Sequence, residues 1–151
     1  MQLSQITKVA LSEAKKAVKK REVPVGAVVF NENDIISKAH NIIFLNNNPL
    51  GHAEILALQK AAKKLKTNNL ISYNLYVTLE PCIICSYVIS KFKIGNLYFG
   101  AYDIKNGSVQ NGARVFLNSK NIYKPEVYGG IGEKKSQDLL KVFFKDLRKK
   151  S

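Results

Sequence analysis

The chain has 151 residues, of which 46% are hydrophobic and 23% charged, and it holds only 4 prolines and 9 glycines. This length and composition exclude a disordered or collagen-like chain and predict one globular domain over residues 1–151. Two cysteines cannot build a disulfide framework, and no apolar run is long enough to span a bilayer or to form a secretion signal. We therefore expect a cytoplasmic protein with no membrane partner.

The chain is strongly basic, with 24 Lys and Arg against 11 Asp and Glu and a net charge of +13. The positive charge is concentrated in three segments with helical patterns, residues 1–22, 60–66 and 133–151. A domain with this balance is expected to bind a polyanion, and nucleic acid is favoured over a membrane surface. The alternative is a lysine-rich surface that only keeps the protein in solution.

Helical and strand patterns alternate along the chain. They predict, in order, a helix over 3–20, strands over 25–30 and 35–39, a helix over 52–66, a strand over 75–79, a helix over 81–91, a strand over 94–100 and a helix from about residue 133. Residues 101–125 have no clear pattern. The last helix is predicted from apolar side chains at helical spacing, namely Leu139, Leu140, Phe143, Phe144 and Leu147. All of these except Leu139 are expected mostly to hold the helix to the sheet. Alternating strands and helices predict an α/β layered domain with a covered central sheet.

The chemistry is carried by two short motifs, each at the start of a predicted helix. His52-Ala53-Glu54 opens one helix, and Pro81-Cys82-Ile83-Ile84-Cys85 opens another. Residues three apart share a helix face, so Cys82 and Cys85 can converge on one metal ion. Thiolate and imidazole ligands favour zinc, and a helix N-terminus favours ionised thiols.

The number of ligands indicates which kind of zinc site this is. His52, Cys82 and Cys85 make three, which leaves the fourth tetrahedral position to water, as in catalytic sites. Zinc would lower the pKa of that water to about 7. Glu54, two residues from a ligand, would carry the water's proton to the substrate.

Two alternatives involve no catalysis at these residues. His40 could act as a fourth ligand and close a structural site, although its spacing from His52 does not fit the usual three to five intervening residues. Cys82 and Cys85 could also be plain buried side chains.

The two motifs together resemble the signature of the zinc-dependent cytidine/deoxycytidylate deaminase superfamily. Within it, the chain is similar to the bacterial tRNA-specific adenosine deaminases over roughly residues 6–148, most clearly in residues 21–28, 75–82 and 99–103. This resemblance implies a three-layer α/β/α sandwich around a central five-stranded mixed sheet, one zinc ion per chain and a homodimer. It also implies the hydrolytic conversion of adenosine to inosine at the wobble position of a tRNA anticodon, with Glu54 as the proton carrier.

The resemblance implies four further site residues. Asn41 matches a substrate-holding Asn, and Ala53 matches a residue whose backbone N–H faces the base. Asp103 and Lys105 fall in the loop that approaches the anticodon stem-loop. The alternative for Asn41 is a side chain that caps a turn at the end of a strand, and the alternative for Asp103 and Lys105 is an ordinary solvated loop pair.

Two other functions remain open. A deaminase of a free base or nucleotide, of the guanine, cytidine or deoxycytidylate type, would use the same zinc and glutamate, but a small substrate gives no reason for a charge of +13. A zinc module that only binds RNA would not need Glu54.

Overall fold

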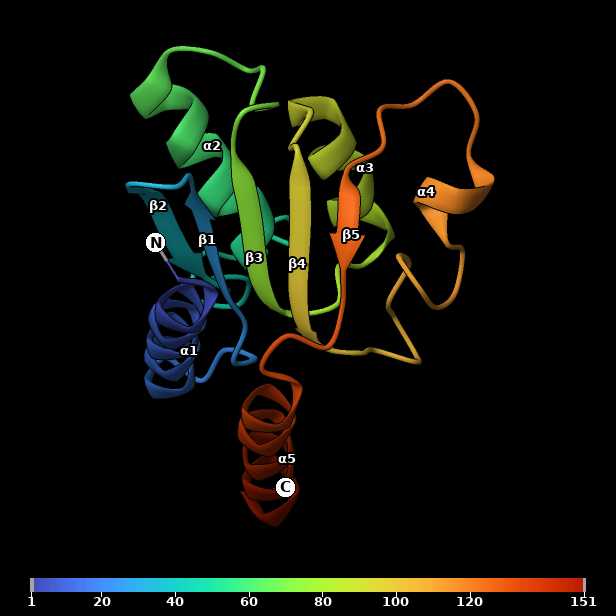
Figure 1. The fold of residues 1–151 in the computed structure, drawn as a ribbon. Coiled ribbons are helices and arrows are strands. Elements are labelled where there is room, and N and C mark those ends of the chain that lie inside the picture. Colours follow the sequence, from blue (N-terminus) through green and yellow to red (C-terminus); the bar gives the residue numbers. More distant parts are fainter. Residues whose placement is uncertain (1, 151) are drawn as a thin grey trace.

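The computed structural model describes residues 2–150 and contains five helices and five strands within that range (Figure 1). In chain order they are α1 (Leu3–Lys19), β1 (Gly26–Phe30), β2 (Ile35–His40), α2 (Ala53–Leu65), β3 (Asn74–Leu79), α3 (Ile83–Phe92), β4 (Asn96–Ala101), α4 (Val115–Asn118), β5 (Glu126–Tyr128) and α5 (Glu133–Lys150). Each helix and strand predicted from periodicity is present, with bounds that differ by about two residues or fewer. The short α4 and β5 were not predicted from periodicity.

The strands form one mixed sheet in the order β2-β1-β3-β4-β5. β1 pairs antiparallel with both β2 and β3, whereas the β3–β4 and β4–β5 pairs are parallel. The expected five-stranded mixed sheet is therefore confirmed. The parallel pair β3–β4 brings the carboxyl ends of both strands to the same edge of the sheet, which is where open α/β sheets bind ligands.

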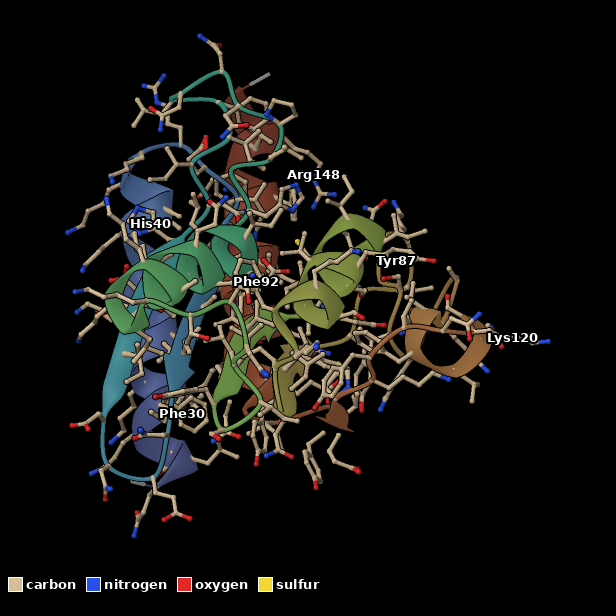
Figure 2. The ribbon with its side chains drawn as sticks, turned by 90° about the horizontal axis from the view of Figure 1, so that it is seen from above. Phe30, His40, Tyr87, Phe92, Lys120 and Arg148 are labelled. Carbon is tan, nitrogen blue, oxygen red and sulfur yellow. The ribbon has the colours of Figure 1, made fainter. Side chains whose placement is uncertain are left out.

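Alternate residues of the central strands pack into two separate cores. Ala27 and Val29 of β1 belong to the larger core under α2 and α3, whereas Val28 and Phe30 belong to a smaller core under α1. α1 and α5 lie on one face of the sheet and α2 and α3 on the other (Figures 1 and 2). This confirms the α/β/α sandwich.

A close contact between backbones holds α1 on its face of the sheet. A Cβ atom built on Gly26 would lie 1.9 Å from the carbonyl oxygen of Ala10. Only glycine permits this approach, so α1 packs directly on the start of β1.

The packing of α5 differs from the prediction. The helix contacts β3 and β4, but it continues away from the sheet (Figure 1). Phe144 and Leu147 are 41% and 54% exposed, while Leu139 and Phe143 face a cavity shared with Val18 of α1. The expectation that these apolar residues mainly hold α5 to the sheet is therefore wrong for Phe144 and Leu147, because helical periodicity identifies an apolar stripe but not what the stripe contacts.

None of the helices in residues 2–150 combines the length and the apolar character needed to cross a membrane.

Candidate active site

Three side chains of types that ligate metals meet at the carboxyl edge of the sheet, namely His52, Cys82 and Cys85. His52 and Cys82 are the N-cap residues of α2 and α3, and Cys85 lies in the first turn of α3. Their ligand atoms all lie within 4.8 Å of one another. In residues 2–150, no other group of three or more His, Cys, Asp and Glu side chains is arranged in this way. The convergence expected from the C-x-x-C spacing is present.

The imidazole of His52 is oriented for metal binding. Its Nε2 lies 3.1 Å from the carbonyl oxygen of Pro49 and its Nδ1 lies 3.8 Å from Sγ of Cys82. A carbonyl oxygen only accepts, so Nε2 carries the proton and Nδ1 faces the thiols, as in many metal sites. Zn–S and Zn–N bonds of about 2.3 and 2.0–2.1 Å at a tetrahedral angle imply an N···S separation of about 3.6 Å. The observed separation therefore fits zinc closely.

The fold shifts the pKa values of the two thiols in opposite directions. The hydrogen bond from Cys85, reinforced by the contact with His52 and opposed by burial, lowers the pKa of Cys82 to about 4. The same Cys82–Cys85 contact, together with burial and the charge of Glu54, raises the pKa of Cys85. The contact with Cys82 raises the pKa of His52 as well. Ligation by both sulfurs would require Cys85 to lose its proton beside the Cys82 thiolate and Glu54, and the positive charge of a zinc ion would stabilise the two thiolates.

His40 takes no part in this group. Its Nδ1 lies 3.2 Å from Glu13 and its Nε2 lies 3.0 Å from the ammonium group of Lys20, both on the α1 side of the sheet. The alternative of a closed site with His40 as fourth ligand is therefore wrong.

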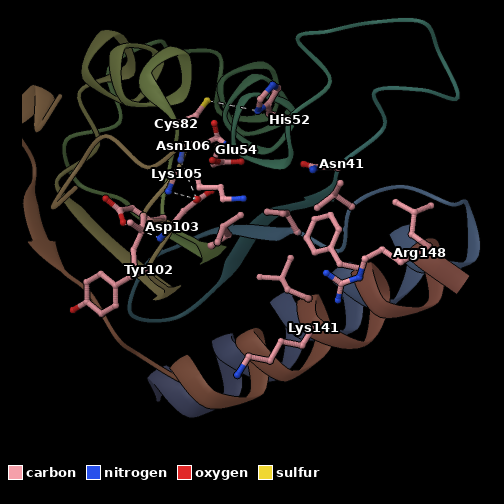
Figure 3. A pocket seen from close by; sticks show the side chains of 18 residues that line it. Asn41, His52, Glu54, Cys82, Tyr102, Asp103, Lys105, Asn106, Lys141 and Arg148 are labelled. Carbon is pink, nitrogen blue, oxygen red and sulfur yellow. Dashed lines mark hydrogen bonds between the residues drawn. The ribbon is translucent and has the colours of Figure 1, made fainter. Parts of the chain in front are cut away.

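Glu54 lies in the first turn of α2, beside the three ligands, and its side chain is directed into the pocket (Figure 3). The residue is only 4% exposed. Burial, opposed by a hydrogen bond from its own backbone N–H, raises the pKa of Glu54 to about 7. A carboxyl group with this pKa is half ionised at neutral pH, which suits a group that both accepts and donates a proton.

A cavity of about 950 Å³ opens in front of these residues (Figure 3). Asn41, Asp103 and Lys105, the substrate residues implied by the resemblance, all line it, but Ala53 does not. Its opposite wall is made by five residues of α5, namely Leu140, Lys141, Phe144, Leu147 and Arg148. The only sequence signal for them is the mixture of apolar and basic side chains on this helix.

Asn41 and Ala53 interact directly with each other. Asn41 follows β2, and its Oδ1 accepts the backbone N–H of Ala53 at 2.8 Å. This bond joins the end of β2 to the first turn of α2 and fixes the orientation of the amide. It also occupies the N–H of Ala53, which the resemblance implies should face the base.

The loop after β4 carries Asp103 and Lys105 into the cavity. Asp103 folds this loop locally, because its Oδ1 accepts the backbone N–H groups of Lys105 and Asn106 at 3.2 and 3.0 Å. The buried carboxylate of Glu80 accepts backbone N–H groups of the same loop, from Asp103 at its start and from Val109 further along the chain. Burial alone would raise the pKa of Glu80, but hydrogen bonds from the Asn111 side chain and from backbone N–H groups lower it. Sequence reasoning did not identify Glu80 as a functional residue.

Comparison with known proteins agrees with this geometry. Residues 1–148 match the MafB19-like deaminase family. The tRNA-specific adenosine deaminase of Rickettsia bellii (strain RML369-C) is 42% identical over 141 residues, which cover 92% of this chain and 97% of that protein. A solved structure from a study of A-to-I editing by tRNA:A34 deaminases at the wobble position of transfer RNA is 37% identical, with a TM-score of 0.88, and covers 91% of this chain and 99% of that one.

The guanine deaminase of Nitrosomonas europaea shares the fold at a TM-score of 0.75, over 89% of this chain and 80% of that one, but only 20% of its sequence. This likeness shows the architecture alone, whereas the other two proteins are 42% and 37% identical to this chain over more than nine-tenths of its length. The site combines a triad that fits zinc with a buried glutamate beside it. Because the tRNA-specific adenosine deaminase of Rickettsia bellii is also 42% identical over nearly the whole chain, the protein belongs to the zinc-dependent tRNA-specific adenosine deaminase family.

Proposed function

We propose that this protein hydrolyses adenosine to inosine at the wobble position of a tRNA anticodon, and that it acts in the cytoplasm. The observation that carries the proposal is the cavity, which joins a deaminase centre to a basic helix wall. Its volume of about 950 Å³ lies near the upper limit of roughly 300–1,000 Å³ for small-molecule pockets. A single base would leave much of this space empty, whereas a base with its flanking nucleotides would fill it.

His52, Cys82 and Cys85 would hold the zinc ion in this proposal, and the bound ion would lower the pKa of the attacking water molecule to about 7. Glu54 accepts a proton from that water and passes it to N1 of the purine as oxygen adds to C6. Glu54 then carries the second water proton to the amino group. The C6–N bond breaks, ammonia leaves, and inosine remains.

The remaining site residues bind and orient the RNA. Asn41, with its Oδ1 held by Ala53, keeps its amide nitrogen as a donor for the substrate. The backbone N–H of Ala53 acts in this proposal by fixing Asn41. Lys105, Lys141 and Arg148 lie around the cavity and can neutralise phosphates on either side of the inserted nucleotide. Single-stranded loops are recognised by enclosing splayed bases in this way.

The alternative of a free-base or nucleotide deaminase predicts different substrates. Initial rates should be measured with an anticodon stem-loop carrying adenosine at the wobble position, and with free adenosine, guanine, cytidine and deoxycytidylate. We expect turnover of the stem-loop at least a hundredfold above each small molecule. Faster turnover of guanine or a cytidine compound would contradict the proposal. Binding of the stem-loop without turnover would favour the non-catalytic zinc module.

We also propose that the protein forms a homodimer through the exposed apolar side chains at the start of α3 and on α4. Ile83 and Ile84 are 50% and 45% exposed, and Leu117 of α4 is 70% exposed. Tyr87 connects the two helices, since its hydroxyl lies 3.2 Å from that of Ser119. Adjacent exposed apolar residues usually mark an interaction surface, and this one begins next to Cys82.

Analytical ultracentrifugation of the wild type and of Ile84→Asp tests the dimer. The wild type should sediment at twice the chain mass and the variant at the chain mass. Val142→Asp, which changes an exposed apolar residue on α5, is the control and should remain dimeric. A monomeric wild type would contradict this interface.

A further inference from the structure

Glu80 is a buried residue at the cavity whose carboxylate is bound by the loop that forms part of the cavity lining. It follows β3 directly, is 2% exposed, and its backbone N–H donates to the carbonyl oxygen of Ala101 at 2.8 Å. This bond fixes it between the carboxyl ends of β3 and β4. Two residues further along the chain is Cys82, so Glu80 connects the metal centre with the loop after β4.

The Glu80 carboxylate accepts five hydrogen bonds from that loop. Oε1 accepts the backbone N–H of Asp103 at 3.0 Å and the side-chain amide of Asn111 at 2.7 Å. Oε2 accepts the backbone N–H groups of Val109, Gln110 and Asn111 at 3.1, 2.8 and 3.0 Å. Two carboxylate oxygens offer about four lone-pair sites, so these donors use the full accepting capacity of the group. Glu80 is therefore left with no role as a proton carrier.

The loop also packs tightly on this carboxylate. A Cβ atom on Gly107 would lie 2.6 Å from Cδ of Glu80 and 2.7 Å from its Oε1. The absence of a side chain at position 107 lets the loop close around Glu80, from Asp103 at one end to Asn111 at the other. The pocket-lining residues of this loop, Ile104, Lys105 and Asn106, lie between these two anchor points.

We infer that Glu80 is a positioning residue, which holds residues 103–111 in the conformation that presents Asp103, Lys105 and Asn106 to the RNA. The inference rests on the proposed function, because it concerns how the loop meets the anticodon. It explains why a carboxylate, which would repel phosphate, lies beside an RNA-binding cavity. The negative charge of Glu80 is surrounded by hydrogen-bond donors of the loop, and it stabilises the loop through these bonds.

Glu80→Gln tests this role, because electrostatics and positioning predict opposite results. Removing a negative charge near the cavity would by itself tighten RNA binding. Gln offers one accepting oxygen and places an NH₂ group against backbone donors, so we expect the loop to loosen. Affinity for the stem-loop, measured by fluorescence anisotropy, should fall roughly tenfold, or about 1.4 kcal/mol. KM should rise to match, while kcat changes less than about threefold, or less than 1 kcal/mol.

Hydrogen exchange gives a readout that does not depend on activity. The amides of Asp103, Val109, Gln110 and Asn111 should exchange faster in Glu80→Gln, while zinc content stays at one per chain. Tyr76→Phe is the matched control, since it loses a buried hydrogen bond of 2.6 Å to the carbonyl of Ile131 on the α1 side of the sheet. The control should lose stability without losing affinity for RNA.

Asn111→Ala decides the matter if Glu80→Gln does not fold. It keeps the carboxylate and removes one donor, so smaller changes in the same directions are expected. Unchanged exchange and unchanged affinity in either folded variant, or tighter RNA binding by Glu80→Gln, would overturn the role of Glu80. Failure of the wild type to bind the stem-loop would instead contradict the proposed function.

Discussion

At the scale of single residues, the burial of Glu54 favours catalysis but lowers the stability of the fold. Burial of its carboxyl group disfavours the charged form and raises its pKa to about 7. The same shift makes the group a proton carrier at neutral pH. A residue placed in this way is expected to lower the stability of the metal-free fold at the pH where the enzyme works.

Glu54→Gln should therefore stabilise the metal-free protein in a pH-dependent way. The pKa of Glu54 is about 7 in the folded protein and 4.5 when the side chain is exposed in the unfolded chain. The free energy of unfolding is therefore highest below pH 4.5, where the carboxyl group is neutral in both states, and it falls as the pH rises to 7. We expect the variant to match the wild type at pH 4 and to exceed it by about 3 kcal/mol at pH 8.

Urea unfolding of chelator-treated protein at both pH values measures this difference. The other titrating groups are common to both proteins and cancel in the comparison. A difference that is the same at pH 4 and pH 8 would show that the carboxyl group is not perturbed by the fold.

Metal binding gives a second prediction at this scale. Cys82→Ser and Cys85→Ser should each lose most of their zinc, because a hydroxyl group is a poor substitute for a thiolate ligand. Elemental analysis of purified protein measures the metal, and His40→Gln is the control, which should retain one zinc ion per chain. Zinc retained at the wild-type level in both cysteine variants would contradict the proposed ligand set.

At the scale of elements, local patterns predicted most of the fold but not how its parts meet. The zinc triad was accessible from the sequence because the spacing of Cys82 and Cys85 on one helix is a local property. β5 was missed because its three residues are too few to show a period. The roles of Glu80 and of the α5 wall depend on which loop or helix lies across the cavity, and that is a property of tertiary structure alone.

The basic residues of α5 give a prediction about this wall. Lys141→Ala with Arg148→Ala should weaken binding of the stem-loop roughly tenfold, or about 1.4 kcal/mol, because both side chains line the cavity. Zinc content should not change. The affinity is measured at fixed salt, since screening alters every phosphate contact.

Lys60→Ala with Lys63→Ala is the control, because it removes the same charge from α2 outside the cavity. The α2 helix begins directly after His52 and rises about 1.5 Å per residue, so these lysines lie roughly 12–16 Å from His52 along the helix axis. Equal losses from the two double variants would indicate a general effect of charge, and α5 would then have no specific part in docking.

For the whole molecule, a net charge of +13 makes RNA affinity sensitive to salt. Each neutralised phosphate releases counterions, so log K should fall against log salt by roughly 0.7 for each contact with single-stranded RNA. Titration of the stem-loop between 50 and 300 mM KCl measures this slope. A flat response would indicate a substrate with few phosphates and would favour the small-molecule deaminase.

The most direct measurement of the proposed reaction uses a complete tRNA pool that lacks inosine. The pool is incubated with the zinc-loaded protein, digested with a nuclease, and the fragments are analysed by mass spectrometry. We expect an increase of about one mass unit, the exchange of an amino group for oxygen, at the wobble adenosine of an anticodon. Glu54→Gln should lower the rate by roughly 10²–10⁴-fold, as expected for the loss of a general acid–base group. No mass change at any wobble adenosine, or an equal change with Glu54→Gln, would contradict the assignment.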